Sequence, residues 1–178
     1  MVGEYSIREL DRGELKSKIS AVFQDFVNYN LSVRNNITLA DEKARINKEL
    51  YEEAKKVAGV DEMLKHEKVQ DTQLLGKYCA KGIELSPGHW QRLSIARMLY
   101  RNRRIFIMDE PFTYIDGESK KKILKDVIEF IGSERTLIFI THDIGKLEKQ
   151  FDRVYYLQDG ELFDKKPPKK RSNKGKKK

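Results

Sequence analysis

The sequence predicts an α/β fold in which a parallel β-sheet is flanked by helices, and three observations indicate it. Short apolar runs rich in β-branched and aromatic residues recur at 19–23, 105–108 and 137–140, as expected for buried strands. The stretches between these runs hold segments dense in helix-forming residues. Each run ends in polar residues, and open α/β sheets present their chemistry at the carboxyl ends of their strands. With 178 residues, the chain is long enough for one domain with a sizeable core.

Helical patterns surround the predicted strands. A brief helix is expected at 12–18, directly before the first strand. Residues 41–66 favour a helical region that breaks at Gly59-Val60. Asp61 is a suitable N-cap for the short helix that follows the break, because its side chain can accept a bond from a free backbone N–H.

Two longer helices are predicted further along the chain. Ser86 is a good N-cap, and Pro87 suits the first helical position because its missing N–H would be unpaired there anyway. Apolar residues at 93, 95, 96, 98 and 99 indicate that this helix is largely buried. The helix at 118–131 is amphipathic, with Ile123, Leu124, Val127, Ile128 and Ile131 on one face. Residues 153–162 then predict a hairpin with Asp-Gly in its turn.

Asp109 and Glu110 are the first candidates for chemistry, because they stand at the end of a predicted strand. One carboxylate can hold Mg²⁺ and the other can act as a base on water. The alternative interpretation is a solvated turn. His142 and Gln24 follow the other two strands, where a structural histidine and an ordinary surface glutamine are the alternatives.

Ser86 and Gly88 form a second candidate site, at the start of a predicted helix. A helix N-terminus with a Ser hydroxyl and a Gly that lets another backbone approach suits an anion. The alternative is a capped helix without a ligand.

Four stretches in a fixed order resemble the ATP-binding cassette (ABC) ATPase family. ELSPGHWQRLSIAR resembles its signature, IFIMDEP its Walker B strand with the catalytic Glu, FTYIDG its D-loop and FITHD its H-loop. QDFVNYNLSVRNNI resembles the Q-loop of exporters, and DTQLLGKYCAKGIELSPG resembles the loop before their signature. The resemblance covers about residues 5–163. It implies a P-loop NTPase-like sheet in a partial nucleotide-binding domain at 1–163, with an inserted helical subdomain at about 28–98.

The resemblance also implies a role for the residues at the strand ends. Asp109 would hold Mg²⁺ through water, and Glu110 would activate the attacking water. His142 would contact the γ-phosphate of ATP. Gln24 would reach Mg²⁺, sense that phosphate and link the site to a transmembrane partner.

Two such domains sandwich ATP in the family, which implies roles across the dimer. Ser86 and Gly88 would complete the nucleotide site of the second domain, and Asp116 would lie at the dimer seam. The signature departs from the family pattern at Pro87 and His89. Because Pro87 lacks a backbone donor, weakened rather than abolished phosphate contact is expected.

One element of the family is missing from the sequence. Its GxxxxGK[ST] loop holds the β- and γ-phosphates, but no Gly-Lys pair of this chain is followed by Ser or Thr. Only 23 residues precede Gln24, so the first strands and the phosphate loop are expected to be missing and ATP turnover by the chain alone to be weak or absent. Three explanations stay open: an interrupted or mis-started coding region, an accessory protein without a nucleotide site, or a partial chain. The retained motif residues favour the first.

The positive charge gathers at the end of the chain. The net charge is +8, but residues 165–178 hold nine Lys or Arg and no acid, so taking these nine away leaves −1. A tail of this composition at 164–178 is expected to be disordered. A solubilising terminus is the first interpretation, and contact with an anionic membrane surface is the second.

The partners are implied by the resemblance as well. They are a second ABC nucleotide-binding domain and the transmembrane domain of a transporter, at the cytoplasmic face of the cell membrane. No apolar run approaches the roughly 18 residues of a membrane-spanning helix, so membrane association is expected only through a partner. The lone Cys79 excludes an intrachain disulfide and fits a reducing cytosol.

Two other functions compete with this interpretation. A soluble relative could bind nucleic acid through the basic tail, and a catalytically silent module could lend only its signature to a partner. The exporter-like loops argue against nucleic acid, because soluble relatives have no transmembrane partner to contact.

Overall fold

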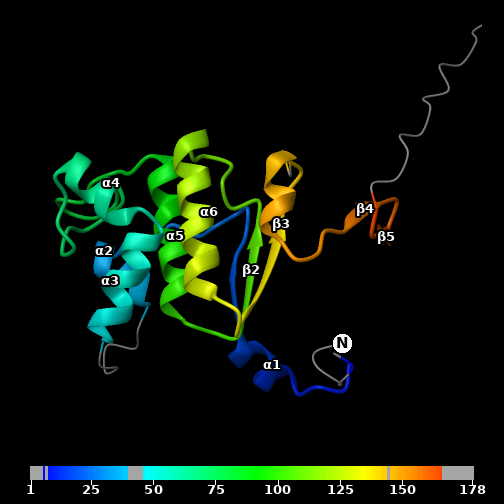
Figure 1. The fold of residues 1–178 in the computed structure, drawn as a ribbon. Coiled ribbons are helices and arrows are strands. Elements are labelled where there is room, and N and C mark those ends of the chain that lie inside the picture. The colour runs from blue at the N-terminus through cyan, green and yellow to red at the C-terminus, as the bar shows by residue number, and fades with distance from the viewer. Residues whose placement is uncertain (1–5, 7, 40–45, 144, 166–178) are drawn as a thin grey trace, which may run out of the picture. The chain divides into compact units, whose positions relative to one another are not determined.

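A three-stranded parallel sheet lies at the centre of the first part of the chain (Figure 1). The computed structural model describes residues 6, 8–39, 46–143 and 145–165. The strands are β1 (Ile19–Val22), β2 (Ile105–Asp109) and β3 (Thr136–Ile140), in the order β1-β2-β3. The predicted α/β fold with a parallel sheet is therefore confirmed.

The register of the sheet brings the carboxyl ends of the strands to one edge. Val22 of β1 lies opposite Met108 of β2, and Asp109 lies opposite Ile140 of β3. Residues that directly follow the three strands consequently start from the same edge.

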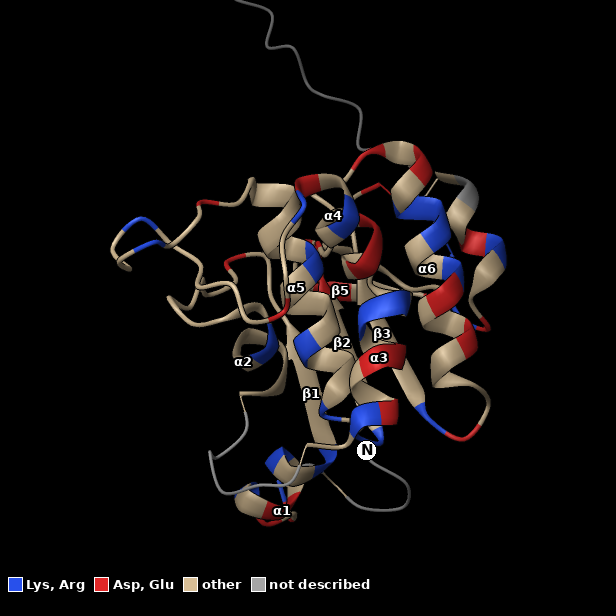
Figure 2. Ribbon diagram, turned by 90° about the vertical axis from the view of Figure 1, so that its left-hand side faces the viewer, with Lys and Arg blue, Asp and Glu red and all other residues tan. Residues whose placement is uncertain are grey.

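Six helices are described in the same unit, which runs from Met1 to Thr141. They are α1 (Arg12–Lys18), α2 (Val33–Thr38), α3 (Lys48–Val57), α4 (Val60–Glu67), α5 (Pro87–Tyr100) and α6 (Gly117–Ile131). α5 packs against α2, α3, α4 and β1, whereas α6 packs against α3 and β3. Both basic and acidic residues occur along α3 and along α6 (Figure 2).

The two long helices differ in how much of their surface is buried. α5 is buried on nearly all sides, as predicted, with Trp90, Gln91, Leu93, Ser94, Ile95, Ala96, Met98 and Leu99 inside. α6 is amphipathic, and Ile123, Leu124, Val127 and Ile131 of its predicted stripe are buried. The expected Ile128 is only half-buried, while Phe130 is buried and its ring packs edge-on against Phe106 of β2 at 6.3 Å.

Two local predictions were wrong. The N-cap of α4 is Gly59, not Asp61, because Gly59 takes a left-handed conformation (φ 68°) that starts the helix two residues earlier. β3 was expected to be buried, but Ile138 and Ile140 are 45% and 48% exposed. Within the described residues β3 is an edge strand, with β2 as its one neighbour.

A buried lysine joins α3, α4 and the segment after α4. The Lys55 ammonium forms ion pairs with Glu52 at 3.1 Å, Asp61 at 3.2 Å and Asp71 at 3.2 Å. Burial alone would lower the pKa of Lys55, but its hydrogen bonds to the three carboxylates together raise that pKa. Asp61 therefore serves this ion cluster instead of capping a helix.

The second unit begins at His142 and contains a short hairpin. A 3₁₀ helix, η1 (Gly145–Gln150), precedes β4 (Tyr156–Gln158) and β5 (Glu161–Phe163), which pair antiparallel. Asp159 and Gly160 both have positive φ in the turn, as the Asp-Gly pair predicts. The Tyr156 hydroxyl donates to Glu148 Oε1 at 2.6 Å, which ties the hairpin to η1. The basic tail lies outside the described residues from 166 onward.

Candidate functional site

Three of the predicted site residues meet at the carboxyl edge of the sheet. Asp109 ends β2, Glu110 follows it, and Gln24 follows the neighbouring β1 by two residues. The two carboxylates are half-buried, whereas Gln24 is exposed. The edge therefore offers two partly shielded carboxylates beside a polar side chain that solvent and ligands can reach.

Glu110 has an unusual backbone that several contacts hold in place. Its φ of 45° lies in the left-handed region that non-glycine residues rarely adopt. Its backbone N–H donates to the Ile140 carbonyl at 3.0 Å, and its own carbonyl accepts from the Thr113 hydroxyl at 3.0 Å. The Thr141 hydroxyl donates to Glu110 Oε2 at 3.3 Å. Such a conformation persists only where the surroundings fix it. Here the end of β3 with Thr141, and the turn with Thr113, hold Glu110 in place.

The N-terminus of α5 lies against the segment that follows Glu110. A Cβ built on Gly88 would come within 2.5 Å of the Tyr114 carbonyl oxygen, so only glycine fits. Ser86 caps the helix as predicted, and its Oγ accepts from the His89 N–H at 3.3 Å. The backbone that Gly88 lets approach is therefore that of Tyr114 in the same chain.

Gln91 is a site residue that the sequence prediction missed. Its side chain is fully buried, accepts from the Tyr114 N–H at 2.9 Å and donates to the Glu110 carbonyl at 3.5 Å. It thus fixes both ends of the Glu110–Tyr114 turn against α5. A polar residue inside an otherwise apolar, buried helical stretch was the available signal. Thr141 was missed because a threonine after a strand is common on protein surfaces.

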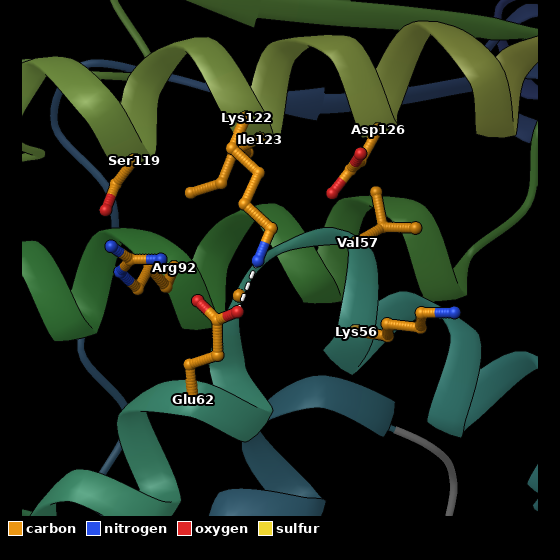
Figure 3. Close-up of a pocket in the computed structure, with 9 residues that line it drawn as sticks. Lys56, Val57, Glu62, Arg92, Ser119, Lys122, Ile123 and Asp126 are labelled. Atoms are coloured by element: carbon orange, nitrogen blue, oxygen red, sulfur yellow. Dashed lines mark hydrogen bonds and ion pairs between the residues drawn. The ribbon is translucent and has the colours of Figure 1, made fainter.

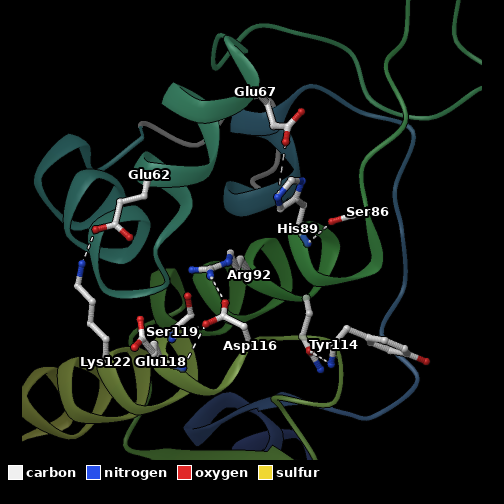
Figure 4. A network of polar contacts seen from close by, with 11 residues as sticks. Glu62, Glu67, Ser86, His89, Arg92, Tyr114, Asp116, Glu118, Ser119 and Lys122 are labelled. Atoms are coloured by element: carbon white, nitrogen blue, oxygen red, sulfur yellow. Dashed lines mark hydrogen bonds and ion pairs between the residues drawn. The ribbon is translucent and has the colours of Figure 1, made fainter.

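Asp116 follows Tyr114 by two residues and lies directly before α6 (Figure 4). It caps α6, and its Oδ1 accepts from the backbone N–H groups of Ser119 at 2.9 Å and Glu118 at 3.2 Å. These bonds lower the pKa of Asp116 below its usual value, and the bond from Ser119 has the largest effect. Arg92 of α5 lies 3.8 Å from its other oxygen. Asp116 is therefore ionised and joined to the signature helix.

The variant residue His89 points toward α4. Its Nε2 lies 3.9 Å from Glu67 Oε1, and burial lowers its pKa. The imidazole is consequently neutral at neutral pH and adds no positive charge at the start of α5.

His142 belongs to the second unit, and its side chain is exposed. The other six predicted site residues all belong to the first unit: Gln24, Ser86, Gly88, Asp109, Glu110 and Asp116.

A small pocket lies elsewhere, between α3, α4, α5 and α6 (Figure 3). Lys122 reaches across it to Glu62, and Arg92 and Gly59 line it. None of the predicted site residues lines this pocket.

Two loops of the first unit pair with each other and expose apolar side chains. The Leu75 N–H donates to the Leu31 carbonyl at 3.0 Å, and Ser32 bridges to Leu74. Both loops carry exposed apolar or aromatic side chains: Val27, Leu31, Leu74 and Tyr78. Cys79 lies in the second of these loops, with its Sγ 3.5 Å from the Asn30 carbonyl oxygen.

The residues at the strand ends suit Mg²⁺. Among the described residues, no three His, Cys, Asp or Glu side chains gather into a protein-only metal cage. Mg²⁺ is commonly held by one or two carboxylates with water and substrate phosphates, and Asp109 provides such a carboxylate. No helix in the described part of the chain has the length and apolar character to cross a bilayer.

Comparisons with known proteins agree with this geometry. The family described as "ABC transporter" matches residues 2–113. The chain is 35% identical over 160 residues to the beta-(1→2)glucan export ATP-binding/permease protein NdvA of Bartonella quintana, which covers 90% of this chain and 26% of that protein. It is 32% identical over 150 residues to the nisin transport ATP-binding protein NisT of Lactococcus lactis, covering 84% of this chain and 24% of NisT.

A solved structure shares the fold. The structure of a bacterial Atm1-family ABC exporter with ATP bound superposes with a TM-score of 0.75 at 24% identity, over 90% of this chain and 27% of that chain. The chain therefore spans about a quarter of the length of the relatives that it matches.

Proposed function

The chain belongs to the ABC transporter family, and from this membership we propose that it is the C-terminal portion of the ATP-binding cassette of an exporter. The single observation that supports this most is the contact of the α5 N-terminus with the segment that runs from Glu110 to Asp116. This contact supports the proposal because it joins the helix of the proposed signature to the segment that follows Asp109 and Glu110. The relatives named above are involved in moving different cargoes, so we propose export without assigning a cargo.

The residues at the strand ends would act on ATP bound with Mg²⁺. ATP supplies the phosphoryl group, and Mg²⁺ neutralises the charge that develops on it. Asp109 would hold Mg²⁺ through water, Glu110 would activate the attacking water, and His142 would contact the γ-phosphate. Gln24 would contact Mg²⁺ and report the state of the site to the partner-facing loop.

The signature residues would serve the site of a second cassette. Ser86 would donate its hydroxyl, and the Gly88 amide would face the phosphates from across the dimer, while Asp116 would lie at the seam. Contacts of this kind contribute positioning and charge stabilisation rather than covalent chemistry. A transmembrane domain would meet the exposed residues Val27, Leu31, Leu74 and Tyr78 and would bring the chain to the cytoplasmic face of the membrane.

Stimulation of a complementary cassette tests this proposal. The reporter is an intact exporter ATP-binding domain whose phosphate loop is kept and whose own signature serine is replaced, so that it lacks a working signature. We expect the chain to restore MgATP hydrolysis by this domain and Ser86→Ala to remove the effect. Ser133→Ala is the matched control, because Ser133 is an exposed serine far along the chain from the signature. Equal stimulation by both variants, or none by the wild type, would contradict the proposal.

The chain alone is proposed to turn over little or no ATP, because its sequence contains no GxxxxGK[ST]. MgATP hydrolysis by the purified chain that disappears in Glu110→Gln would refute this part. A catalytically silent module that lends only its signature to a partner would also restore hydrolysis in the reporter domain without turnover of its own.

A further inference from the structure

Arg97 joins two segments of the first unit that are far apart in the sequence. It lies in α5, three residues before the helix ends, and its guanidinium reaches the segment 27–36. Its Nε donates to the Asn36 carbonyl at 2.8 Å, and its terminal nitrogens donate to Asn36 Oδ1 at 3.1 Å and the Val27 carbonyl at 3.3 Å. The Tyr29 ring packs against the guanidinium, with its centroid 4.6 Å from Cζ.

Asn36 continues this connection into the loop before α2. Its side chain is fully buried, and its amide nitrogen donates to the carbonyls of Tyr29 at 2.9 Å, Leu31 at 3.2 Å and Ser32 at 3.2 Å. Three carbonyls of one loop therefore converge on a single amide. The orientation of that amide is fixed by Arg97, which binds its oxygen.

The electrostatics show why an arginine is needed at this position. Burial lowers the pKa of Arg97 to about 10, which leaves the guanidinium charged at neutral pH. Among the described residues, Arg97 forms no ion pair with a carboxylate, so carbonyl dipoles and an aromatic face hold its charge. A flat fork of donors can satisfy these partners together, whereas the single ammonium of a lysine cannot.

We propose that Arg97 is a positioning residue that makes the loop 27–32 and helix α5 one rigid body. The same loop exposes Val27 and Leu31, and the far end of α5 is capped by Ser86. Eleven residues separate Ser86 from Arg97, which corresponds to roughly 16 Å along the helix. This connection does not rest on the proposed function.

Hydrogen exchange measured on the full 178-residue chain tests the rigid connection. In Arg97→Met, the amides of Leu31 and Leu75, which donate to carbonyls of the loop 27–32 at 2.8 and 3.0 Å, should exchange at least about tenfold faster than in the wild type, because the loop can then open by itself. The amides of α5 should stay close to their wild-type protection. Arg97→Lys, which keeps the charge but not the fork, should give an intermediate result.

Leu124→Ala is the matched control for a general loss of stability. Leu124 is fully buried in α6, away from the loop, so its truncation should speed exchange in the loop and in α5 to the same degree. If Arg97→Met shows this uniform pattern, or leaves the loop protected, the proposal is overturned.

A milder variant keeps the test decisive where Arg97→Met fails to fold. Tyr29→Leu removes only the aromatic face, and it should raise exchange in the loop selectively and by a smaller factor. Uniform exchange in this variant would again count against the proposal. None of these readouts depends on ATP turnover, so a failure to stimulate the reporter domain would leave them unaffected.

Discussion

Helices α5 and α6 both begin at a candidate nucleotide residue, yet their N-termini are fixed by different forces. α5 starts at the neutral cap Ser86, is buried on nearly all sides, and has its Gly88 packed on the Tyr114 carbonyl. α6 starts at the charged cap Asp116, exposes one face, and has open space around its Gly117. Packing therefore determines where the first helix begins in space, whereas hydrogen bonds to a carboxylate determine it for the second. The first arrangement should tolerate fewer changes.

The largest difference is expected for truncation of apolar residues. Leu93→Ala in α5 should lower the free energy of unfolding by about 2–5 kcal/mol, because Leu93 is fully buried and a cavity would remain. Ile128→Ala in α6 should cost less, because this side chain is only half-buried. Urea unfolding followed by circular dichroism measures both, and equal losses would break the comparison.

The two glycines give the next largest difference. Gly88→Ala should lower the free energy of unfolding by about 1–3 kcal/mol, because the new methyl group meets backbone that cannot easily move. Gly117→Ala should leave stability unchanged or slightly raised, since nothing lies within 4 Å of the added atom and alanine favours a helix. The same unfolding experiment measures both variants. An unchanged free energy of unfolding in Gly88→Ala would show that the backbone at Tyr114 can move away from the added methyl group.

The two helix starts also differ in their backbone N–H donors, because Pro87 at the first position of α5 has none. Pro87→Gly should raise stimulation of the reporter cassette by about tenfold, the value of one added hydrogen bond to a charged group. Pro87→Ala restores the N–H without the flexibility of glycine and should show most of the same gain. Rates that stay at the wild-type level in both variants would mean that this position does not contact phosphate.

The smallest effect concerns the two caps and their response to pH. The pKa of Asp116 is lowered in the folded chain, so its contribution to stability is present above the usual value of 3.8 and is lost as the pH falls through the folded value. The stability difference between wild type and Asp116→Asn should therefore shrink in acid. The difference between wild type and Ser86→Ala should not change over the same range, because a hydroxyl does not titrate there. Stability curves at several pH values check both.

Local signals predicted much of this fold. The caps at Ser86, the Pro at the first helical position and the Asp-Gly hairpin each depend on residues within one turn of one another, and all were confirmed. Two predictions failed for different reasons. Asp61 is a suitable cap by its type, but two nearby residues decide its role: Gly59 starts the helix earlier and Lys55 forms an ion pair with the Asp61 carboxylate. The apolar run of β3 does not reveal how many strands pair with it, because the neighbouring strands are distant in the sequence.

In the candidate site, too, some residues could be predicted from the sequence and others could not. Asp109, Glu110 and Gln24 were found because parallel strands bring their ends to one edge. Gln91 and Arg97 were missed because their importance comes from backbone groups far along the chain, 19 and 23 residues away for Gln91 and 61 and 70 residues away for Arg97, which no local pattern contains. The roles of the site residues in ATP chemistry stay predictions.

The buried Trp90 gives the chain an intrinsic fluorescence probe. It is the single tryptophan of the sequence, it lies 3% exposed near the start of α5, and its indole Nε1 donates to Glu84 at 3.5 Å. Intrinsic fluorescence therefore reports from one known place, four residues after the Ser86 cap, against a background of tyrosines only. Engagement of the signature by a second cassette can be followed by this emission in solution, without attaching a dye.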